Sequence, residues 1–396
     1  MEKPYNILMV GIQPWDIEIG SNFKNMALEL SLNHRVIYVN SPLDRLTALT
    51  KRKDSKVQKR LKVRKGKKKV LEQINSNLWI FSPPIIIESI QWLPNLIFSV
   101  LNEYNNRRIA STIRPILQKM NFKDFILLND SDMFRSFHLK KLLKPKAYIY
   151  YTRDNLMTVP YWKKHGKHYE PELMHTSDLV IGNSPHLISY ARQFNSEAHF
   201  IGQGCETKNY STNRSFTKPD DMASLDGKII GYTGLLSSRR LDIELIHFLA
   251  KSEPEWNFVL IGPEESCFAQ SKLHKLPNIH FLGNKKPEEL ANYVAHFDLC
   301  FNPQAVNELT LANYPRKIDE YLAAGKGIVA TKTPTMMLFE KVVHLASSKR
   351  HFLQLLHAAI NEECPKLSAK RQAVAKEHTW STCIERFWKA YTNITL

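Results

Sequence analysis

The sequence predicts an α/β protein made of two Rossmann-like domains, each a doubly wound parallel sheet, that face a common cleft. Short apolar runs alternate with segments of helical period along most of the chain, which is typical of parallel strands joined by helices. The length of 396 residues suits two domains. A polar, turn-rich stretch, TKNYSTNRSFTKPDDMASLDG, separates two such series. The expected divisions are a domain over 1–206, a linker over 207–227, a second domain over 228–375 and a closing segment over 376–396.

The first half opens as strand, loop, helix and strand. YNILMVG is a short apolar run that ends in Gly, FKNMALELSLN has helical spacing, and RVIYVN is again apolar. The pattern resumes with FILLN (125–129), AYIYY (147–151) and DLVIGNS (178–184). Continuous apolar runs of this length indicate parallel strands buried on both faces.

The second half repeats the alternation. The expected strands are KIIGYTG, WNFVLIG, PNIHFLG, DLCFNP and KGIVATKT, and helical segments such as LDIELIHFLAKS and PEELANYVAHF lie between them. The closing segment places apolar side chains on one face of a helix, at Trp380, Ile384, Phe387, Trp388 and Tyr391. Ligands of doubly wound domains bind at the carboxyl ends of the strands, so we expect the site there.

The composition indicates a cytoplasmic protein. The five Cys show no C-x-x-C or other metal spacing, which favours reduced thiols over disulfides. The start MEKPYNILMV passes directly into a strand-like run, so no signal peptide is expected. No window reaches about 18 uninterrupted apolar residues, the length of a membrane-spanning helix.

The segment NYPRKIDEYLAAGKGIVAT indicates an anion site. Pro315 suits the first position of a helix and Gly325 suits its end. Arg316 and Lys317 then fall in the first turn, where cations are disfavoured by roughly 0.3–1 kcal/mol unless an anion lies between them. Glu320 follows one turn later on the face of Lys317. The alternative interpretation is a solvated amphipathic helix.

A second cationic pair follows the first strand of this half. In IIGYTGLLSSRRLDIELI the strand ends at Gly234, and Arg239 and Arg240 stand where the next helix begins. Two anion sites on one sheet suit a diphosphate. An Arg pair on a solvated surface is the alternative.

With these residues in view, the second half resembles the nucleotide-binding domain of GT-B glycosyltransferases, near family 4 and the teichuronic-acid biosynthesis glycosyltransferases. The matching pieces are GYTGLLSSRRLD, NFVLIGP, PNIHFLG and PRKIDEYLAAGKGIVAT; the first half matches more loosely through GSNFKNMALEL, EPELMHTSDLVIGNS and IGQGCE. The resemblance implies that Arg240 and Lys317 hold the donor diphosphate and that Glu320 binds the ribose hydroxyls. It also implies that the closing helix crosses back to the N-terminal domain. The remaining donor-binding residues expected in this half are Arg239, Arg316, Gly234, Gly262 and Gly283.

Two positions depart from the family pattern. Many relatives carry E-x7-E, and Glu320 supplies the second Glu, but Ala312 stands at the first. Relatives often have His after the strand AYIYYT, where this chain has Arg153 and Asp154. We expect Asp154 to act as the acceptor-side base, with Arg153 beside it. The resemblance implies retention at the anomeric carbon.

Other residues of the first half are weaker candidates. Gly20, Ser21 and Asn22 join strand to helix and are expected at the donor phosphate or the acceptor, with a plain turn and helix cap as the alternative. Asp130 and Asp132 form a D-x-D motif that a turn explains, so no metal is expected. His165 and His168 are interpreted as surface residues that border the cleft.

The run KRKDSKVQKRLKVRKGKKKV at 51–70 carries twelve Lys or Arg and one acidic residue. The net charge of +17 is concentrated in the first half, because 1–200 holds 31 basic and 17 acidic residues. Downstream, IIIESIQWLPNLIF is largely apolar, so residues 51–104 are a candidate surface for an anionic membrane, with about 1 kcal/mol per cation. A mobile solvated loop is the alternative. Nucleic acid is not expected, because no aromatic-plus-basic module or helix-turn-helix pattern is present.

The expected function is that of a metal-independent glycosyltransferase in cell-surface polysaccharide biosynthesis. The donor is a nucleotide-diphosphate sugar, which serves as a co-substrate, and no separate cofactor is expected. The acceptor is a glycan or a lipid-linked glycan, and the enzyme would be peripheral on the inner face of the cell membrane. Two alternatives stay open: a sugar-nucleotide epimerase on the same fold, and a catalytically silent sugar-nucleotide-binding protein, which Ala312 favours.

Overall fold

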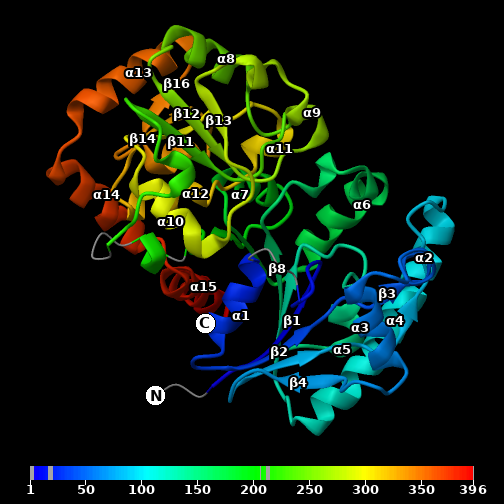
Figure 1. The fold of residues 1–396 in the computed structure, drawn as a ribbon. Coiled ribbons are helices and arrows are strands. Elements are labelled where there is room, and N and C mark those ends of the chain that lie inside the picture. Colours follow the sequence, from blue (N-terminus) through cyan, green and yellow to red (C-terminus); the bar gives the residue numbers. More distant parts are fainter. Residues whose placement is uncertain (1–3, 17–20, 206, 211–214, 396) are drawn as a thin grey trace. The chain divides into compact units, whose positions relative to one another are not determined.

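The computed structural model describes residues 4–16, 21–205, 207–210 and 215–395 (Figure 1). It divides into two compact units: unit 1 is Met1–Gly202 with Cys383–Leu396, and unit 2 is Gln203–Thr382. The chain therefore passes from unit 1 to unit 2 just before the expected linker, and the described part of 207–227 belongs to unit 2. Gly20, one of the expected ligand-binding residues, lies outside the described residues.

Unit 1 is built on an eight-stranded sheet that is parallel except for the antiparallel pair β4 and β5. Its strands are β1 (Asn6–Gly11), β2 (Arg35–Val39), β4 (Leu71–Gln73), β5 (Leu78–Phe81), β7 (Ile126–Asp130), β8 (Ala147–Thr152), β9 (Leu179–Gly182) and β10 (Ala198–Phe200). The spatial order is β10-β9-β8-β7-β1-β2-β5-β4. Because β1 pairs with both β2 and β7, the direction of winding reverses at β1, as in a doubly wound sheet.

Unit 1 contains eight helices among its described residues, several of which cover the two faces of this sheet. They are α1 (Asn22–Leu30), α2 (Arg45–Thr50), α3 (Ser55–Arg64), α4 (Asn95–Lys119), α5 (Leu139–Leu143), α6 (Pro160–Thr176), α7 (Pro185–Ala191) and most of α15 (Trp380–Thr395). On one face, Ile109 and Ile113 of α4 join the core that contains Leu8 and Ile37. On the other face, Phe23 of α1 packs on Tyr38, with ring centroids 5.4 Å apart.

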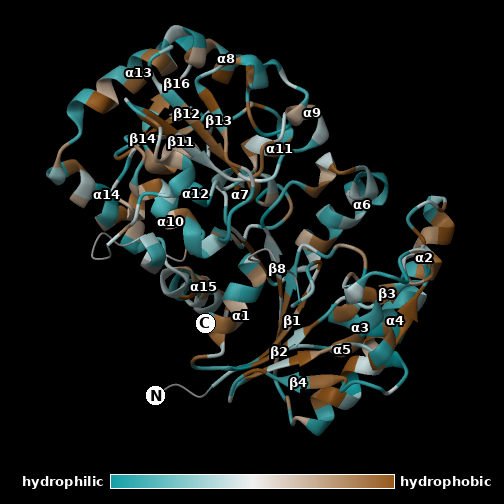
Figure 2. Cartoon of the chain, viewed as in Figure 1, coloured by the Kyte–Doolittle hydropathy of each residue, from teal (hydrophilic) through white to brown (hydrophobic). Residues whose placement is uncertain are grey.

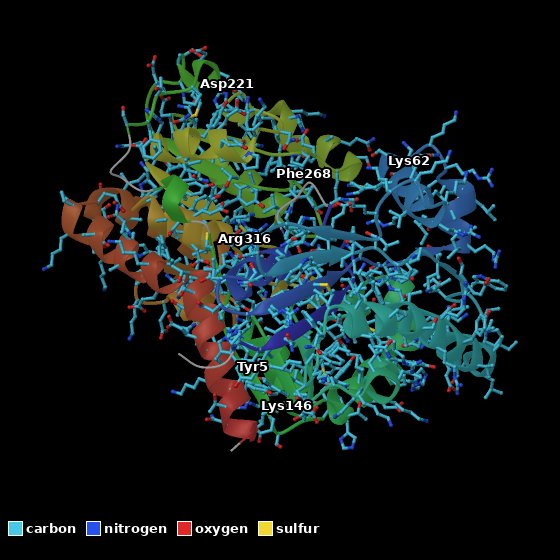
Figure 3. All side chains as sticks on the ribbon, turned by 90° about the horizontal axis from the view of Figure 1, so that it is seen from below. Tyr5, Lys62, Lys146, Asp221, Phe268 and Arg316 are labelled. Carbon is cyan, nitrogen blue, oxygen red and sulfur yellow. The ribbon has the colours of Figure 1, made fainter. Side chains whose placement is uncertain are left out.

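The last helix, α15, packs on the start of unit 1. Phe387 and Tyr391 are buried, and Trp388 stacks on Tyr5 with ring centroids 4.7 Å apart. Figure 3 labels Tyr5, which lies beside this helix. The helical face that the sequence predicts for the closing segment is thus the face that is buried, and residues 383–396 complete unit 1.

Half of the basic run 51–70 forms the helix α3, and turns lie on either side of it. Asp54 accepts hydrogen bonds from the amides of Lys56 and Val57 and so caps α3. Val57 packs with Leu43 and Ala48 in a small apolar cluster beneath α2 and α3. A short two-stranded sheet, β3 (Leu43–Asp44) and β6 (Ile86–Ile87), links this region to the segment before α4.

Unit 2 is built on a six-stranded, fully parallel sheet. Its strands are β11 (Ile229–Thr233), β12 (Asn257–Ile261), β13 (Ile279–Phe281), β14 (Leu299–Asn302), β15 (Gly327–Thr331) and β16 (His344–Ala346). The order β13-β12-β11-β14-β15-β16 is that of the Rossmann fold, with the switch point between β11 and β14.

Successive residues of a strand in unit 2 enter different cores. Ile229 belongs to the cluster formed with α10 (Pro287–Ala295), α12 (Lys317–Ala323) and α14 (Pro365–Glu377). Ile230 belongs to the cluster formed with α8 (Ile243–Ser252) and α13 (Lys349–Glu362). The short helices α9 (Ser266–Ala269) and α11 (Glu308–Leu311) lie in loops that follow strands. This two-sided covering confirms the predicted doubly wound architecture.

No helix in the described part of the chain combines the length and the apolar character that a membrane crossing requires.

Candidate active site

Two glycines shape the carboxyl end of β11. Gly234 and Gly262 adopt φ of +135° and +145°, a region that favours glycine. A Cβ at Gly262 would lie 2.0 Å from the carbonyl oxygen of Gly234, so the loops after β11 and β12 can approach this closely only without side chains. The amide of Gly262 donates to the carbonyl of Gly283, which follows β13. The three glycines expected at the donor therefore lie in adjoining loops at the end of the sheet.

Lys317 lies beside this glycine loop. Its Nζ donates to the hydroxyl of Tyr232 and stands 3.8 Å from the centroid of that ring. A Cβ on Gly234 would come within 2.8 Å of the same Nζ. Burial lowers the pKa of Lys317 to about 7; the charge of Glu320 opposes this shift and the charge of Arg240 adds to it. A second cation near a desolvated ammonium is an arrangement that an anion would stabilise.

The loop that carries Arg240 is fixed by backbone contacts. The carbonyl of Arg240 accepts from the amide of Ala305, and that of Arg239 accepts from the side chain of Asn307. Asp242 then caps α8 by accepting from the amide of Leu245. Arg240 is half-buried and its charge acts on both Tyr232 and Lys317, whereas Arg239 is exposed. The structure brings Arg240 to Lys317 and leaves Arg239 at the surface.

Glu320 lies one turn along α12 from Lys317. Its Oε2 accepts a hydrogen bond of 3.3 Å from the hydroxyl of Tyr210, and its Oε1 lies 3.6 Å from Nη2 of Arg316. Burial raises the pKa of Glu320, opposed by the charges of Arg316 and Lys317. Tyr210 belongs to the stretch expected to be a linker, and sequence reasoning missed it. A tyrosine in a polar segment gives no signal that it reaches a carboxylate more than a hundred positions away.

The start of α12 differs slightly from the prediction. Arg316 is the N-cap and Lys317 the first helical residue, so Pro315 precedes the helix instead of opening it. Residues 315 and 316 form a tight turn, in which the amide of Ile318 donates to the carbonyl of Pro315. Gly325, with φ of +71°, follows the end of the helix as predicted.

A buried pair supports α12 from behind. Asp319 is fully buried, and its Oδ1 lies 2.6 Å from Nδ1 of His378, the residue that ends α14. The hydroxyl of Tyr314 lies 3.3 Å from the same nitrogen. Sequence reasoning missed this pair, because nothing local marks His378 as the partner of a residue in another helix.

In unit 1, the site expected after β8 is an ionic network. Arg153 donates through Nε and Nη2 to the two carboxylate oxygens of Asp130, at 2.6 and 3.1 Å. Its Nη1 donates to Asp154 at 3.1 Å. Asp130 is fully buried, whereas the side chain of Asp154 is 38% exposed. Asp154 therefore has a partly exposed carboxylate just after β8. Arg153 contacts this carboxylate and is itself paired with the buried Asp130.

Both aspartates of the D-x-D motif have arginine partners within unit 1. Asp130 is occupied by Arg153, and Asp132 accepts from the amide and from Nε of Arg135. Among the residues that the structure describes, no three His, Cys, Asp or Glu side chains are grouped as a metal would require.

The remaining candidates of unit 1 have local partners. Ser21 is buried and caps α1 by accepting from the amide of Lys24, and Asn22 is the first residue of that helix. His165 is not a surface residue, contrary to the expectation: it is buried, stacks on Phe98 at 3.7 Å and contacts Asn95. An apolar ring beside the imidazole explains why burial lowers the pKa of His165.

Comparisons with known proteins locate similarity to glycosyltransferases in unit 2. A sequence profile described as glycosyl transferases group 1 matches residues 227–348, which contain the loops of β11 and β12 and helix α12. The putative teichuronic acid biosynthesis glycosyltransferase TuaH of Bacillus subtilis is 26% identical over 210 residues, 50% of this chain and 51% of TuaH. The chain thus matches about half the length of this curated relative.

Solved structures match over nearly the whole chain. HepE of Anabaena, crystallised in complex with UDP, has a TM-score of 0.62 at 15% identity and covers 98% of this chain and 100% of its own. A glycosyltransferase of Rickettsia africae has a TM-score of 0.66 at 15% identity, covering 100% of this chain and 99% of its own. Residues 227–348 are therefore a glycosyl transferase group 1 domain, and the chain as a whole has the GT-B fold of glycosyltransferases.

Proposed function

We propose that the protein transfers a sugar from a nucleotide-diphosphate donor, with UDP as the first nucleotide to test, to a hydroxyl of a glycan or lipid-linked acceptor in cell-surface polysaccharide biosynthesis. The observation that carries the proposal is the half-buried ammonium of Lys317 beside the Gly234 loop, with the charge of Arg240 acting on it. This pair lies inside the group 1 domain, at the switch point of a Rossmann-type sheet. The UDP complex of the similarly folded HepE supports the choice of nucleotide.

In this proposal the diphosphate is held by Lys317 and Arg240. Breaking the anomeric bond leaves negative charge on the diphosphate, and these cations would stabilise it in a desolvated site. The glycines after β11 and β12 let the backbone approach the phosphates without a side chain between them. Gly283 and the exposed Arg239 are assigned to the outer part of the same site.

Glu320 is assigned to the ribose. A carboxylate accepts hydrogen bonds from two vicinal hydroxyls, and Arg316 and Tyr210 hold this carboxylate from its two oxygens. Ser21 and Asn22, at the start of α1, are assigned to the acceptor or to the donor phosphate. The hydrogen bond from the Lys24 amide shows that Ser21 caps its helix, a role compatible with either ligand.

Asp154 is proposed as the acceptor-side base. Arg153 donates to Asp154 through one nitrogen and to the buried Asp130 through two. Arg153 would thus orient Asp154, through a single contact, toward the acceptor hydroxyl. Retention would require the acceptor oxygen to attack the face that the diphosphate leaves, with the acceptor proton passing to Asp154 and the nucleotide diphosphate departing.

Binding of the nucleotide tests the proposal directly. Isothermal titration calorimetry with UDP should give saturable 1:1 binding, weakened about 10- to 100-fold in Lys317→Ala and in Arg240→Ala, because each loses a charge-assisted hydrogen bond. Arg350→Ala, an exposed arginine on α13, is the matched control and should bind UDP like the wild type. A panel of nucleotide diphosphates that gives no binding would contradict the proposal.

A silent sugar-nucleotide binder is the second candidate, and one observation favours it. Ala312 is completely buried at the position where relatives carry the first glutamate of the pair, so no side chain there reaches the sugar. A protein of this kind would bind the donor without releasing UDP. Measuring UDP release with and without a glycan acceptor separates transfer from silent binding, and an epimerase would convert the donor sugar with no acceptor present.

A further inference from the structure

The α2–α4 surface of unit 1, made of α2, α3, residues 65–70 and residues 88–104, exposes large apolar side chains. Among the described residues the three most exposed large apolar side chains lie here: Leu96 at 84%, Trp92 at 70% and Val100 at 69%. Ile97, Tyr104, Leu46 and Leu49 are also exposed, at 49–58%. An exposed apolar patch of this kind usually marks an interaction site.

The apolar stripe is a property of α4 itself. Leu96, Val100 and Tyr104 follow one another at intervals of four, so they form one line along the helix. The opposite side of α4 buries Asn102, Asn105 and Asn106, and the amides of Asn105 and Asn106 donate to the carbonyls of Glu88 and Phe134. The first half of this helix therefore buries three polar amides beside Phe98 and exposes a line of large apolar side chains to solvent.

The second exposed pair, on α2, is tied to the same segment. Arg45 forms a two-point ion pair with Glu88, at 2.7 and 2.6 Å, and the amide of Leu46 donates to Ser89. Figure 2 shows the apolar ribbon of these outermost turns in brown beside α2. Leu46 and Leu49 thus belong to the same surface as the α4 stripe.

Cations border this apolar area. α3 packs under α2 through Val57 and Ala48, so the basic run 51–70 lies alongside it. Lys62 on α3 is exposed (Figure 3), and so are Lys67, Lys68 and Lys69 in the loop that follows. Asp16 pairs with Arg60 at 2.9 Å and with Lys59 at 3.8 Å, which leaves the run strongly positive.

We infer that this surface docks the protein on an anionic lipid bilayer, with the α4 stripe in the interfacial region and the α3 lysines at the headgroups. Trp92 and Tyr104 are residue types that favour the membrane interface, and lysines reach toward lipid phosphates over apolar surface. A nucleic acid would match the lysines and leave the aliphatic stripe in water. The inference goes beyond the proposed function, because bilayer binding requires no donor and no turnover.

Vesicle sedimentation with the full-length chain tests it. The protein should bind vesicles of phosphatidylcholine with about one-third phosphatidylglycerol, bind pure phosphatidylcholine far less, and be released as salt is raised. Leu96→Ser combined with Val100→Ser should weaken binding at least about tenfold, and so should Lys67, Lys68 and Lys69 changed together to Gln.

Matched controls distinguish the surface from general effects. Leu32→Ser with Val306→Ser alters two apolar side chains that are 65% and 61% exposed elsewhere, and Lys366, Lys370 and Lys376 changed to Gln remove the same charge from α14. Both control proteins should bind like the wild type. Equal loss in the controls, equal binding to uncharged vesicles, or no vesicle binding would overturn the inference.

Two other binding partners of this surface, a second copy of the chain and nucleic acid, would give different results. If the wild type sediments as a dimer and Leu96→Ser with Val100→Ser yields a monomer, the surface is an interface between two copies and the bilayer inference fails. Tight duplex DNA binding lost in the lysine variant would also overturn it. Lys317→Ala should keep full vesicle binding while losing UDP affinity, so failure of the nucleotide site and failure of the docking surface are measured separately.

Discussion

At the scale of single residues, Lys317 links the geometry of unit 2 to a pH dependence. Its pKa of about 7 in the free protein means that the ammonium is only partly charged at neutral pH. A bound diphosphate would favour the charged form, so binding should take up a proton when the pH is above about 7.

We therefore predict that UDP affinity falls as pH rises above about 7, by up to about tenfold per pH unit, until the pKa of the bound state is reached. UDP itself is fully ionised in this range, since the second phosphate pKa is about 6. Lys317→Arg should bind with little change between about pH 7 and 9, because arginine keeps its proton. Calorimetry in two buffers of different ionisation enthalpy measures the proton uptake, and a pH-independent wild-type affinity would contradict the assignment.

Glu170 gives a prediction about stability. It is buried on α6, accepts a 2.9 Å hydrogen bond from Tyr150, and burial raises its pKa to about 7. The folded state therefore holds a proton that the unfolded state releases near pH 4.5, so the stabilisation present below about 4.5 is lost as pH rises to about 7.

Glu170→Gln keeps the acceptor oxygen and removes this titration. Between about pH 4.5 and 8 the wild type should lose on the order of 3 kcal/mol of unfolding free energy relative to the variant. Denaturant unfolding of both proteins across this range measures the difference. Parallel pH profiles would show that Glu170 does not titrate as the structure implies.

The sequence indicates residue types at the site better than it indicates their partners. Lys317 and Arg240 could be predicted as ligand-binding residues because each is a cation near the start of a helix, where the helix dipole disfavours positive charge. Asp130 could not be assigned to Arg153, because the two are 23 positions apart with a helix and a strand between them, and the pairing arises only when β7 and β8 lie side by side. An ion pair that depends on which strands are neighbours in the sheet leaves no signal in the local sequence.

At the scale of elements, α15 is predicted to stabilise unit 1. Phe387 is completely buried, and Phe387→Ala should reduce the unfolding free energy of unit 1 by about 3–5 kcal/mol. Lys389→Ala, an exposed position on the same helix, should change it by less than about 0.5 kcal/mol. Thermal melts of the two variants make the comparison, and equal stability would show that α15 adds little.

The elements that periodicity predicts well are the buried ones. The apolar runs of both sheets and the aromatic face of α15 appear where expected, since burial imposes a pattern on the residues. The basic run was harder, because its charge suggested a mobile loop. Its helical signal was the cap at Asp54 followed by Val57 and Leu61 at a spacing of four.

At the scale of the whole molecule, two units with separate cores should respond separately to ligand. Saturating UDP should raise the melting temperature of the transition that reports unit 2, by an amount that grows with the logarithm of its concentration. Hydrogen exchange of the β11 and α12 amides is the local measurement, and Lys317→Ala is the control that should remove the effect. Protection confined to unit 1 would place the nucleotide elsewhere.

The overall architecture followed from the alternation of strands and helices, but the assignment of segments to units did not. The stretch 207–227 looks like a linker because it is polar, yet Tyr210 and Met222 in it are buried in the core of unit 2. A polar composition indicates that most of a segment is solvated. It does not reveal which few of its side chains are buried in a domain core.

The return of the chain to unit 1 after Thr382 has a consequence for biosynthesis. As the polypeptide leaves the ribosome, unit 2 has all its residues before unit 1 does. Until α15 emerges, the surface of unit 1 that buries Phe387 and Tyr391 remains exposed to solvent. A nascent chain arrested before that helix would hold a finished second unit joined to an unfinished first one, the form that chaperones would meet.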